Sequence, residues 1–156
     1  MPRRKEIVRR IPDPDWRFES RLVSKFINSL MIQGKKSTAE TIFYKAMDLI
    51  EERAKQEPLP VFEKAMKNVG PVVMVRSRRV GGSVYQVPSE VRDDQQRAFA
   101  IRWLIIAARG RTENTMIERL ANELIAASKA EGAAVRRKEE TYRMADANRA
   151  FAHYRW

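Results

Sequence analysis

Three arginines crowd into four positions just before a pair of glycines near the middle of the chain. Arg76, Arg78 and Arg79 precede Gly81-Gly82 within the stretch VVMVRSRRVGGSVYQVPSEV, residues 72–91. The guanidinium group presents a planar fork of donors that matches phosphate oxygens and base edges. Arg76 and Arg78 are two residues apart, so on a strand they share one face. The cluster therefore indicates nucleic-acid binding, and the alternative is an edge hairpin that its charges keep soluble.

The residues around these arginines predict a β-hairpin over residues 72–90. Gly81-Gly82 tolerates the positive φ angles of a tight reversal, which puts the tip at residues 80–83. Pro71 and Pro88 are expected to bound the hairpin, because neither can donate a ladder hydrogen bond. The strands themselves are indicated by β-branched and aromatic residues: Val73, Val75, Val84, Tyr85 and Val87.

The overall composition favours a soluble protein with a polyanionic partner. The 156 residues include 31 Lys and Arg against 20 Asp and Glu, a formal charge of +11, and 44% are hydrophobic. A surplus of this size favours nucleic acid as a partner, with an anionic membrane second. No cysteine is present, the N-terminus lacks the apolar core of a signal peptide, and the longest apolar run, Trp103 to Ala108, is far too short to span a bilayer. We therefore expect a cytoplasmic protein.

Basic residues also gather at both ends of the chain. Residues 1–14 predict a basic arm that orders on nucleic acid, the alternative being a solvated tail. Its basic residues are Arg3, Arg4, Lys5, Arg9 and Arg10. The opposite end, NRAFAHYRW, interleaves arginines with aromatic residues, which either stack on bases or a protein partner or fold back onto the body. These are Arg149, Phe151, His153, Tyr154, Arg155 and Trp156.

The rest of the chain predicts a mainly α fold, a bundle of six helices with the hairpin protruding between the third and fourth. Residues 15–156 are expected to form a single domain. Apolar residues recur at the helical period in segments that start or end near Gly, Pro or capping residues. These segments are 16–32, 37–53, 60–68, 94–109, 115–129 and a polar last helix, 133–156. Ser37 and Glu40 predict a capping box, and the helix over 94–109 is expected to be the most central.

Enzyme chemistry finds little support in the residues. His153 is the only histidine and has neither cysteines nor a second histidine to bind zinc with it. The fragment Gly34-Lys35-Lys36-Ser37 lacks the upstream glycine of a phosphate-binding loop, since position 29 is Ser29. Lys35 and Lys36 remain candidates for phosphate contact in a turn. A glycine turn at Gly110 keeps a second class open, a stand-alone regulator with a helix in a DNA groove.

Several long motifs resemble the family of bacterial small-subunit ribosomal protein seven. They are SRLVSKFINSLMIQGKKSTAETIFYKA (20–46), VRSRRVGGSVYQVP (75–88), RWL (102–104), LANEL (120–124) and MADANRAFAHYRW (144–156). The resemblance covers essentially the whole chain. Met74 and Trp16 depart from it, because relatives commonly have an acidic residue and a tyrosine there.

The resemblance implies a non-enzymatic structural protein of the small ribosomal subunit, located on the ribosome in the cytoplasm. Such a protein binds the 3′ major domain of 16S-type rRNA, nucleates assembly of the head and lines the exit site beside mRNA and tRNA. Ribosomal proteins nine and eleven are implied as neighbours, and some relatives repress their own operon. No cofactor, metal, membrane or small-molecule substrate is implied.

Carried over by position, the resemblance implies two groups of contact residues. The implied rRNA contacts are Arg3, Arg4, Lys5, Arg9, Arg10, Lys35, Lys36, Arg76, Arg78, Arg79, Arg109 and Arg111. The residues implied to lie near tRNA or mRNA are Arg79, Val80, Gly81, Gly82, Tyr85, Arg149, Tyr154, Arg155 and Trp156.

Overall fold

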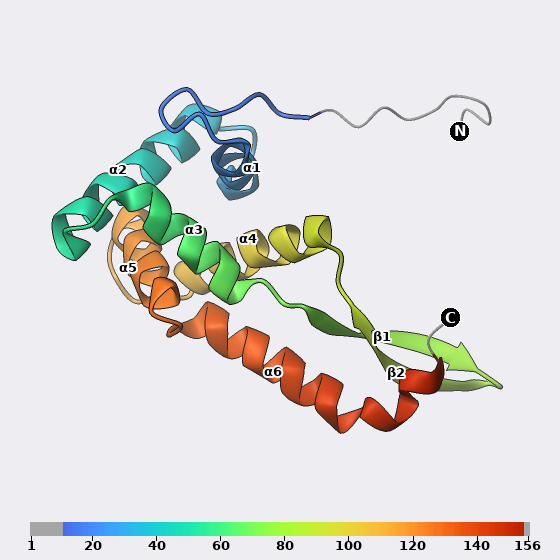
Figure 1. Cartoon of the computed structure of the whole chain (residues 1–156). Coiled ribbons are helices and arrows are strands. Elements are labelled where there is room, and N and C mark those ends of the chain that lie inside the picture. The colour runs from blue at the N-terminus through green and yellow to red at the C-terminus, as the bar shows by residue number, and fades with distance from the viewer. Residues whose placement is uncertain (1–10, 155–156) are drawn as a thin grey trace, which may run out of the picture.

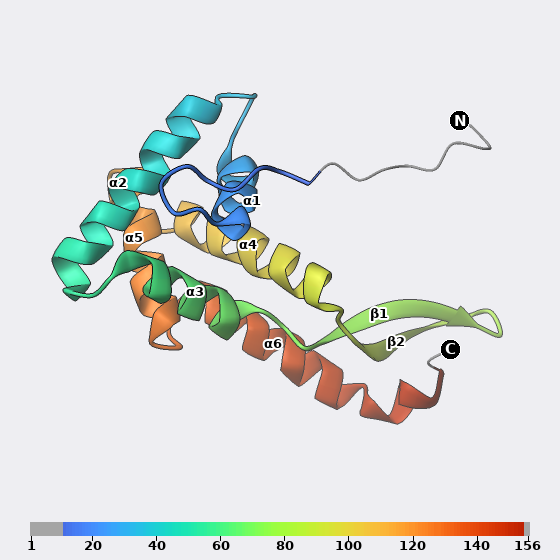
Figure 2. The same cartoon turned by 45° about the horizontal axis from the view of Figure 1, so that its top comes forward.

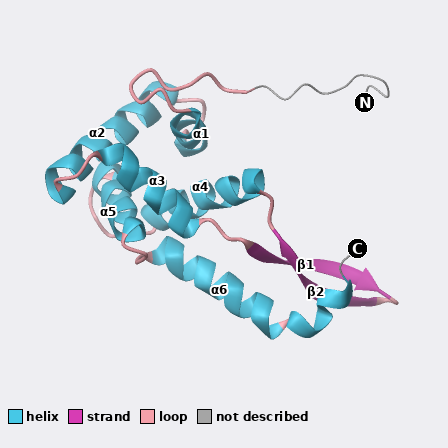
Figure 3. Ribbon diagram, in the orientation of Figure 1, coloured by secondary structure: helices cyan, strands magenta, loops and turns pink. Residues whose placement is uncertain are grey.

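The structure, a computed structural model, describes residues 11–154 and confirms the predicted mainly α architecture (Figures 1 and 3). This part of the chain contains six α-helices and one antiparallel hairpin, which lies between the third and fourth helices as predicted. In chain order the elements are α1 (Arg21–Leu30), α2 (Lys36–Ala54), α3 (Pro58–Val69), β1 (Val73–Val80), β2 (Ser83–Glu90), α4 (Asp93–Arg109), α5 (Met116–Ser128), α6 (Ala133–Ala147) and the 3₁₀-helix η1 (Arg149–Tyr154).

The core lies among the first five helices and is built on three phenylalanines. Phe26 of α1, Phe43 of α2 and Phe62 of α3 are fully buried, and their ring centroids lie 5.3–5.6 Å apart. Two of the three pairs meet edge to face, the geometry that the ring quadrupole favours. These contacts fix how α1, α2 and α3 pack, and that packing determines where the surface of α1 faces α4.

The most enclosed helix is α5, so the prediction that residues 94–109 would be the most central is wrong. Every residue of α5 is buried or half-buried, because α2, α3, α4 and α6 all pack against it. By contrast, α4 keeps one face in solvent, where Ile106 is 51% exposed. Arginines on that face must reach water, which holds this side of α4 at the surface.

The first helix begins later than predicted. The buried carboxylate of Asp15 accepts hydrogen bonds from the backbone amides of Arg17 and Phe18, both at 3.1 Å, and so stabilises a turn there. Glu19 then adopts a positive φ of 49°, which no helix can contain. Consequently α1 starts at Arg21 and the preceding residues form a separate turn.

The predicted capping box at Ser37 and Glu40 is also wrong. Gly34, with φ of 75°, turns the chain early enough for α2 to begin at Lys36, and no side chain caps it. The Glu40 carboxylate instead lies 3.8 Å from the Lys36 ammonium. A complete capping box stands at the start of α5, between Thr115 and Glu118.

The hairpin has the predicted tip but a different end. Gly81 and Gly82 both have positive φ, 57° and 88°, as a type I′ turn requires. Pro88 lies inside β2 opposite Val75, so the prediction that it bounds the hairpin is wrong. Counted from the two-residue turn, this pair is a non-hydrogen-bonded one, where proline removes no ladder donor.

The hairpin projects away from the helical body, and α6 with η1 runs beside it (Figures 1 and 2). The last helix, predicted over 133–156, ends early, at Ala147. It is followed by η1, which bends toward β2. The hydroxyl of Tyr142 on α6 accepts a hydrogen bond of 3.0 Å from the backbone amide of Val72 at the base of the hairpin. Within residues 11–154 no helix has the length and apolar character needed to cross a membrane.

Candidate nucleic-acid interface

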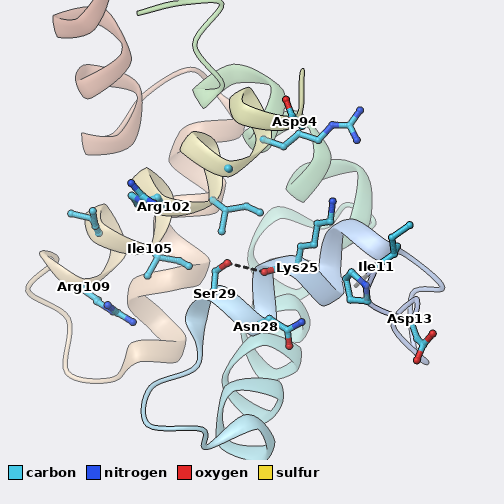
Figure 4. Close-up of a pocket in the computed structure, with 14 residues that line it drawn as sticks. Ile11, Asp13, Lys25, Asn28, Ser29, Asp94, Arg102, Ile105 and Arg109 are labelled. Carbon is cyan, nitrogen blue, oxygen red and sulfur yellow. Dashed lines mark hydrogen bonds between the residues drawn. The ribbon is translucent and has the colours of Figure 1, made fainter. Parts of the chain in front are cut away.

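An open groove of about 940 Å³ separates α1 from α4 and is closed at one end by residues 11–13. Figure 4 shows Lys25 of α1 across from Arg102 and Ile105 of α4. Two further arginines of α4, Arg97 and Arg109, line the same groove. Four cationic side chains thus line the groove together with four isoleucines, and Asp13 and Asp94 are the acidic residues of the lining.

Local geometry explains how these cations come together. Arg102 and Arg109 are seven residues apart on α4, nearly two full turns, so they project on the same side. The Arg109 guanidinium also donates a hydrogen bond of 3.3 Å to the carbonyl of Leu30, which ties α4 to the end of α1. Positive charge and apolar surface in one groove suit a polyanion that also presents flat apolar surfaces, such as RNA.

The residue-level predictions had included only Arg109 of this groove. Lys25, Arg97 and Arg102 were missed, because the sequence does not show that α1 and α4 face each other. The seven-residue spacing of Arg102 and Arg109 was a usable signal for a basic face on α4.

The three clustered arginines, Arg76, Arg78 and Arg79, are divided between the two faces of the hairpin. Residues directly opposite each other across a ladder share a face. Arg76 pairs with Val87 and Arg78 with Tyr85, so these two arginines share a face as predicted, and that face carries the buried Val87. Arg76 donates a hydrogen bond of 3.0 Å to Gln95 of α4.

Arg79 lies on the opposite face of the hairpin. It pairs with Val84, which is 64% exposed, and Arg79 itself is exposed. The glycine tip is exposed as well, and a Cβ placed on Gly81 or Gly82 would meet no atom within 4 Å. The hairpin therefore presents a slim tip with one arginine on its outer face.

The aromatic residues of the C-terminal end fold back onto the hairpin. The ring of Tyr85 lies 5.2 Å from that of Phe151 and 5.1 Å from that of Tyr154, between centroids. Of the two readings that the sequence left open, the structure favours folding back for Phe151 and Tyr154. Arg149 and His153 remain exposed.

Two further predicted RNA contacts lie in contrasting surroundings. Lys35, at the end of the turn between α1 and α2, and Lys36, the first residue of α2, are both exposed. Arg111 is engaged inside the chain, with its Nε 2.7 Å from Glu123, and it also contacts Glu113 at 3.1 Å. Burial alone would lower the pKa of Arg111, but the hydrogen bonds and charges of the two glutamates outweigh it and raise the pKa.

Arg111 therefore has the least capacity for RNA among the predicted contacts that the structure describes. The remaining predicted contacts lie outside the described residues. They are Arg3, Arg4, Lys5, Arg9, Arg10, Arg155 and Trp156.

A basic groove and a projecting hairpin that carries arginines, on a helical body, indicate the class of nucleic-acid-binding proteins. The enclosure of α5 argues against a helix-in-groove DNA regulator, because the helix after the Gly110 turn is not available to enter a groove.

Comparison with known proteins gives the family. The family model for ribosomal protein S7p/S5e matches residues 2–149. The chain is 60% identical to the small ribosomal subunit protein uS7 of Syntrophotalea carbinolica and 60% identical to that of Gemmatimonas aurantiaca. It is 55% identical to the uS7 of Chelativorans sp., and each match covers all 156 residues and the whole relative. The chain belongs to the ribosomal protein S7p/S5e family.

Family membership confirms four predictions that the sequence carried. The resemblance to ribosomal protein seven is confirmed, and so is the assignment to RNA-binding proteins of translation. Because the relatives are bacterial ribosomal proteins, the predicted location on the ribosome in the cytoplasm and the prediction that the protein is not an enzyme are confirmed too.

Proposed function

We propose that this protein binds the 3′ major domain of small-subunit rRNA and nucleates assembly of the subunit head. The observation that carries the proposal is the groove between α1 and α4, where Lys25, Arg97, Arg102 and Arg109 converge from two helices. The exposed Lys35 and Lys36 and the hairpin arginines extend the positive surface beyond the groove.

Recognition in this arrangement is mainly of backbone and shape. The deep, narrow major groove of A-form RNA excludes side chains, so arginines and lysines contact phosphates where RNA strands converge. A junction of several RNA helices offers such a surface, and two helices with a groove between them match its curvature better than a single projecting helix. Binding at a junction would also fix the angles between RNA helices, which is what nucleating a domain requires.

The hairpin and the C-terminal end serve the exit site in this proposal. The slim tip, Val80 to Gly82, enters the space near mRNA and tRNA, with Arg79 exposed behind it. Tyr85 and Tyr154 lie together behind the tip, and Arg149 lies nearer the base of the hairpin, beside Val73 and Pro88. In this proposal the tail, Arg155 and Trp156 included, contacts tRNA or a neighbouring subunit protein. Ribosomal proteins nine and eleven are the neighbours that we expect.

The experiment is chemical footprinting of the purified protein on small-subunit rRNA with excess total DNA as competitor. We expect protection confined to the 3′ major domain. Replacing Arg102 and Arg109 with alanine should abolish most of that protection, whereas the same change at Arg136 and Arg137, exposed on α6 away from the groove, should leave it intact. Protection scattered over other domains, or equal loss in both double variants, would contradict the proposal.

The hairpin role is tested separately by deleting Gly81 and Gly82. The tip makes no contribution to the helical core, so the variant should fold and footprint rRNA like the wild type. We expect the defect in ribosomes that carry it, as weakened retention of tRNA in the exit site. Loss of helical circular dichroism would instead mean that the hairpin supports the whole fold.

A further inference from the structure

A second, smaller cleft adjoins the basic groove and contains an exposed tryptophan. The cleft has a volume of about 320 Å³ and shares Pro12, Asp13 and Asn28 with the lining of the groove, so the two are neighbours on the surface. Trp16 forms one wall. This volume is at the small end of ligand-sized clefts, which begin at about 300 Å³, and it suits one nucleoside rather than a duplex.

Trp16 is exposed and yet firmly held. It is 77% exposed, the most exposed large apolar residue of the described chain. Its indole meets the ring of Tyr44 at 5.6 Å with an interplanar angle of 77°. The Tyr44 hydroxyl donates a hydrogen bond of 2.6 Å to Asp15, whose carboxylate is the acceptor that shapes the turn before α1.

These contacts preorganise the indole as a platform. Burial and the neighbouring Asp15 both raise the pKa of Tyr44. Its hydroxyl therefore stays protonated at any physiological pH and keeps donating its hydrogen bond to Asp15. A large aromatic surface that is rigid before binding loses little conformational entropy when a ring stacks on it. Stacking on aromatic side chains is the usual way that proteins hold unpaired bases.

The charges around the cleft indicate which part of a nucleotide enters it. Carboxylates outnumber cations here, since Asp13, Asp15 and Glu40 line the cleft against Lys36 alone. Asp15 already accepts three hydrogen bonds from within the chain, so Asp13 and Glu40 are the acceptors that a ligand would use. A phosphate is therefore disfavoured inside, but the adjoining groove supplies cations for the backbone on both sides. Carboxylates accept hydrogen bonds from the amino groups of guanine, adenine and cytosine, and uracil has no such group.

We propose that this cleft binds one unpaired base of the RNA that lies in the groove, stacked on Trp16 and bearing an exocyclic amino group. Lys36, 60% exposed on the rim, contacts the adjacent phosphate. The inference rests on the proposed RNA-binding function and deepens it by naming a base-binding subsite.

The test compares Trp16→Ala and Trp16→Phe with the wild type on a transcript of the 3′ major domain. Alanine should weaken binding roughly five- to a hundredfold, the usual effect of removing one stacking residue, and phenylalanine should restore most of it. Met144→Ala, which removes another exposed apolar side chain, 56% exposed on α6, should change nothing. Thermal unfolding checks that each variant is folded.

Tryptophan fluorescence with short single-stranded oligonucleotides tests the cleft independently of ribosomal RNA. Ten-nucleotide oligoadenylate and oligocytidylate should quench the wild type more than oligouridylate does, and Trp16→Phe should lose that difference. If the transcript binds wild type and Trp16→Ala equally and no quenching is lost, the base-binding cleft is refuted while the RNA-binding function stands. If the wild type fails to bind the transcript at all, the proposed function fails, and the oligonucleotide result alone decides the cleft.

Discussion

At the scale of single residues, Glu123 is a buried carboxylate that links α5 to α6 and to the loop between α4 and α5. It is 1% exposed, and one carboxylate oxygen lies 2.7 Å from the Arg111 guanidinium. The other oxygen accepts a hydrogen bond of 3.0 Å from the backbone amide of Ala134, in the first turn of α6. A residue of α5 therefore caps α6, and this contact helps to position α6 together with the hydrogen bonds from Lys138 to Asn68 and from Val72 to Tyr142.

Gly132 makes that cap possible, which gives a prediction for Gly132→Ala. Its φ is 98°, and a Cβ there would lie 2.9 Å from the Glu123 carboxylate. Gly34→Ala is the matched control, because Gly34 also has a positive φ but nothing within 4 Å. We expect Gly34→Ala to lower the free energy of unfolding by about 1 kcal/mol through backbone strain alone.

Gly132→Ala should cost roughly 1–2 kcal/mol more than the control, since it also displaces a buried, paired carboxylate. Urea denaturation followed by circular dichroism measures both losses. Equal losses in the two variants would show that the Glu123 carboxylate moves aside freely and does not fix α6.

At the scale of elements, the hairpin and the C-terminal end form one projecting unit. Two antiparallel strands alone are at best marginally stable in water. Here the Tyr142 hydroxyl holds the base of the hairpin, and the rings of Phe151 and Tyr154 hold Tyr85 farther out. The direction of the tip is therefore set by η1 as well as by the turn that joins β2 to α4.

Replacing Phe151 and Tyr154 with alanine should loosen the hairpin without unfolding the body. Each aromatic pair contributes about 0.5–1.5 kcal/mol beyond area burial, so the loss of both pairs should make backbone amides of β1 and β2 exchange roughly five- to a hundredfold faster. Hydrogen exchange measured by NMR resolves this, with Met144→Ala as a control on the same side of the molecule. Unchanged exchange in the strands would contradict a supporting role for the C-terminal end.

At the scale of the whole molecule, the formal charge of +11 is the feature that RNA binding must use. Binding that releases counterions from phosphates weakens steeply with salt. If around six phosphates are engaged, affinity for the 3′ major domain should fall by roughly a thousandfold between 50 and 200 mM salt. A filter-binding titration measures the slope, and a flat one would rule out a backbone-dominated interface.

The fold was largely predictable because its signals are local. Apolar residues at the helical period gave the six helices, and Gly81-Gly82 gave the tip of the hairpin, since each pattern depends on near neighbours only. Element ends were less predictable. The late start of α1 depends on the Asp15 turn, and Pro88 is tolerated in β2 because of its place in the register.

The sequence by itself determined that this is a basic helical protein with an arginine-rich hairpin, and its motifs were enough to indicate the family. Only the tertiary structure decided which arginines share a surface. Arg102 and Arg109 meet Lys25 because three phenylalanines pack α1 against its neighbours, whereas Arg111 turns inward to Glu123. Likewise, Trp16 lines the smaller cleft beside the groove because the Asp15 turn and Tyr44 hold it there. Spacing along a chain fixes the face of one element, but the side that faces a neighbour is fixed by packing between elements.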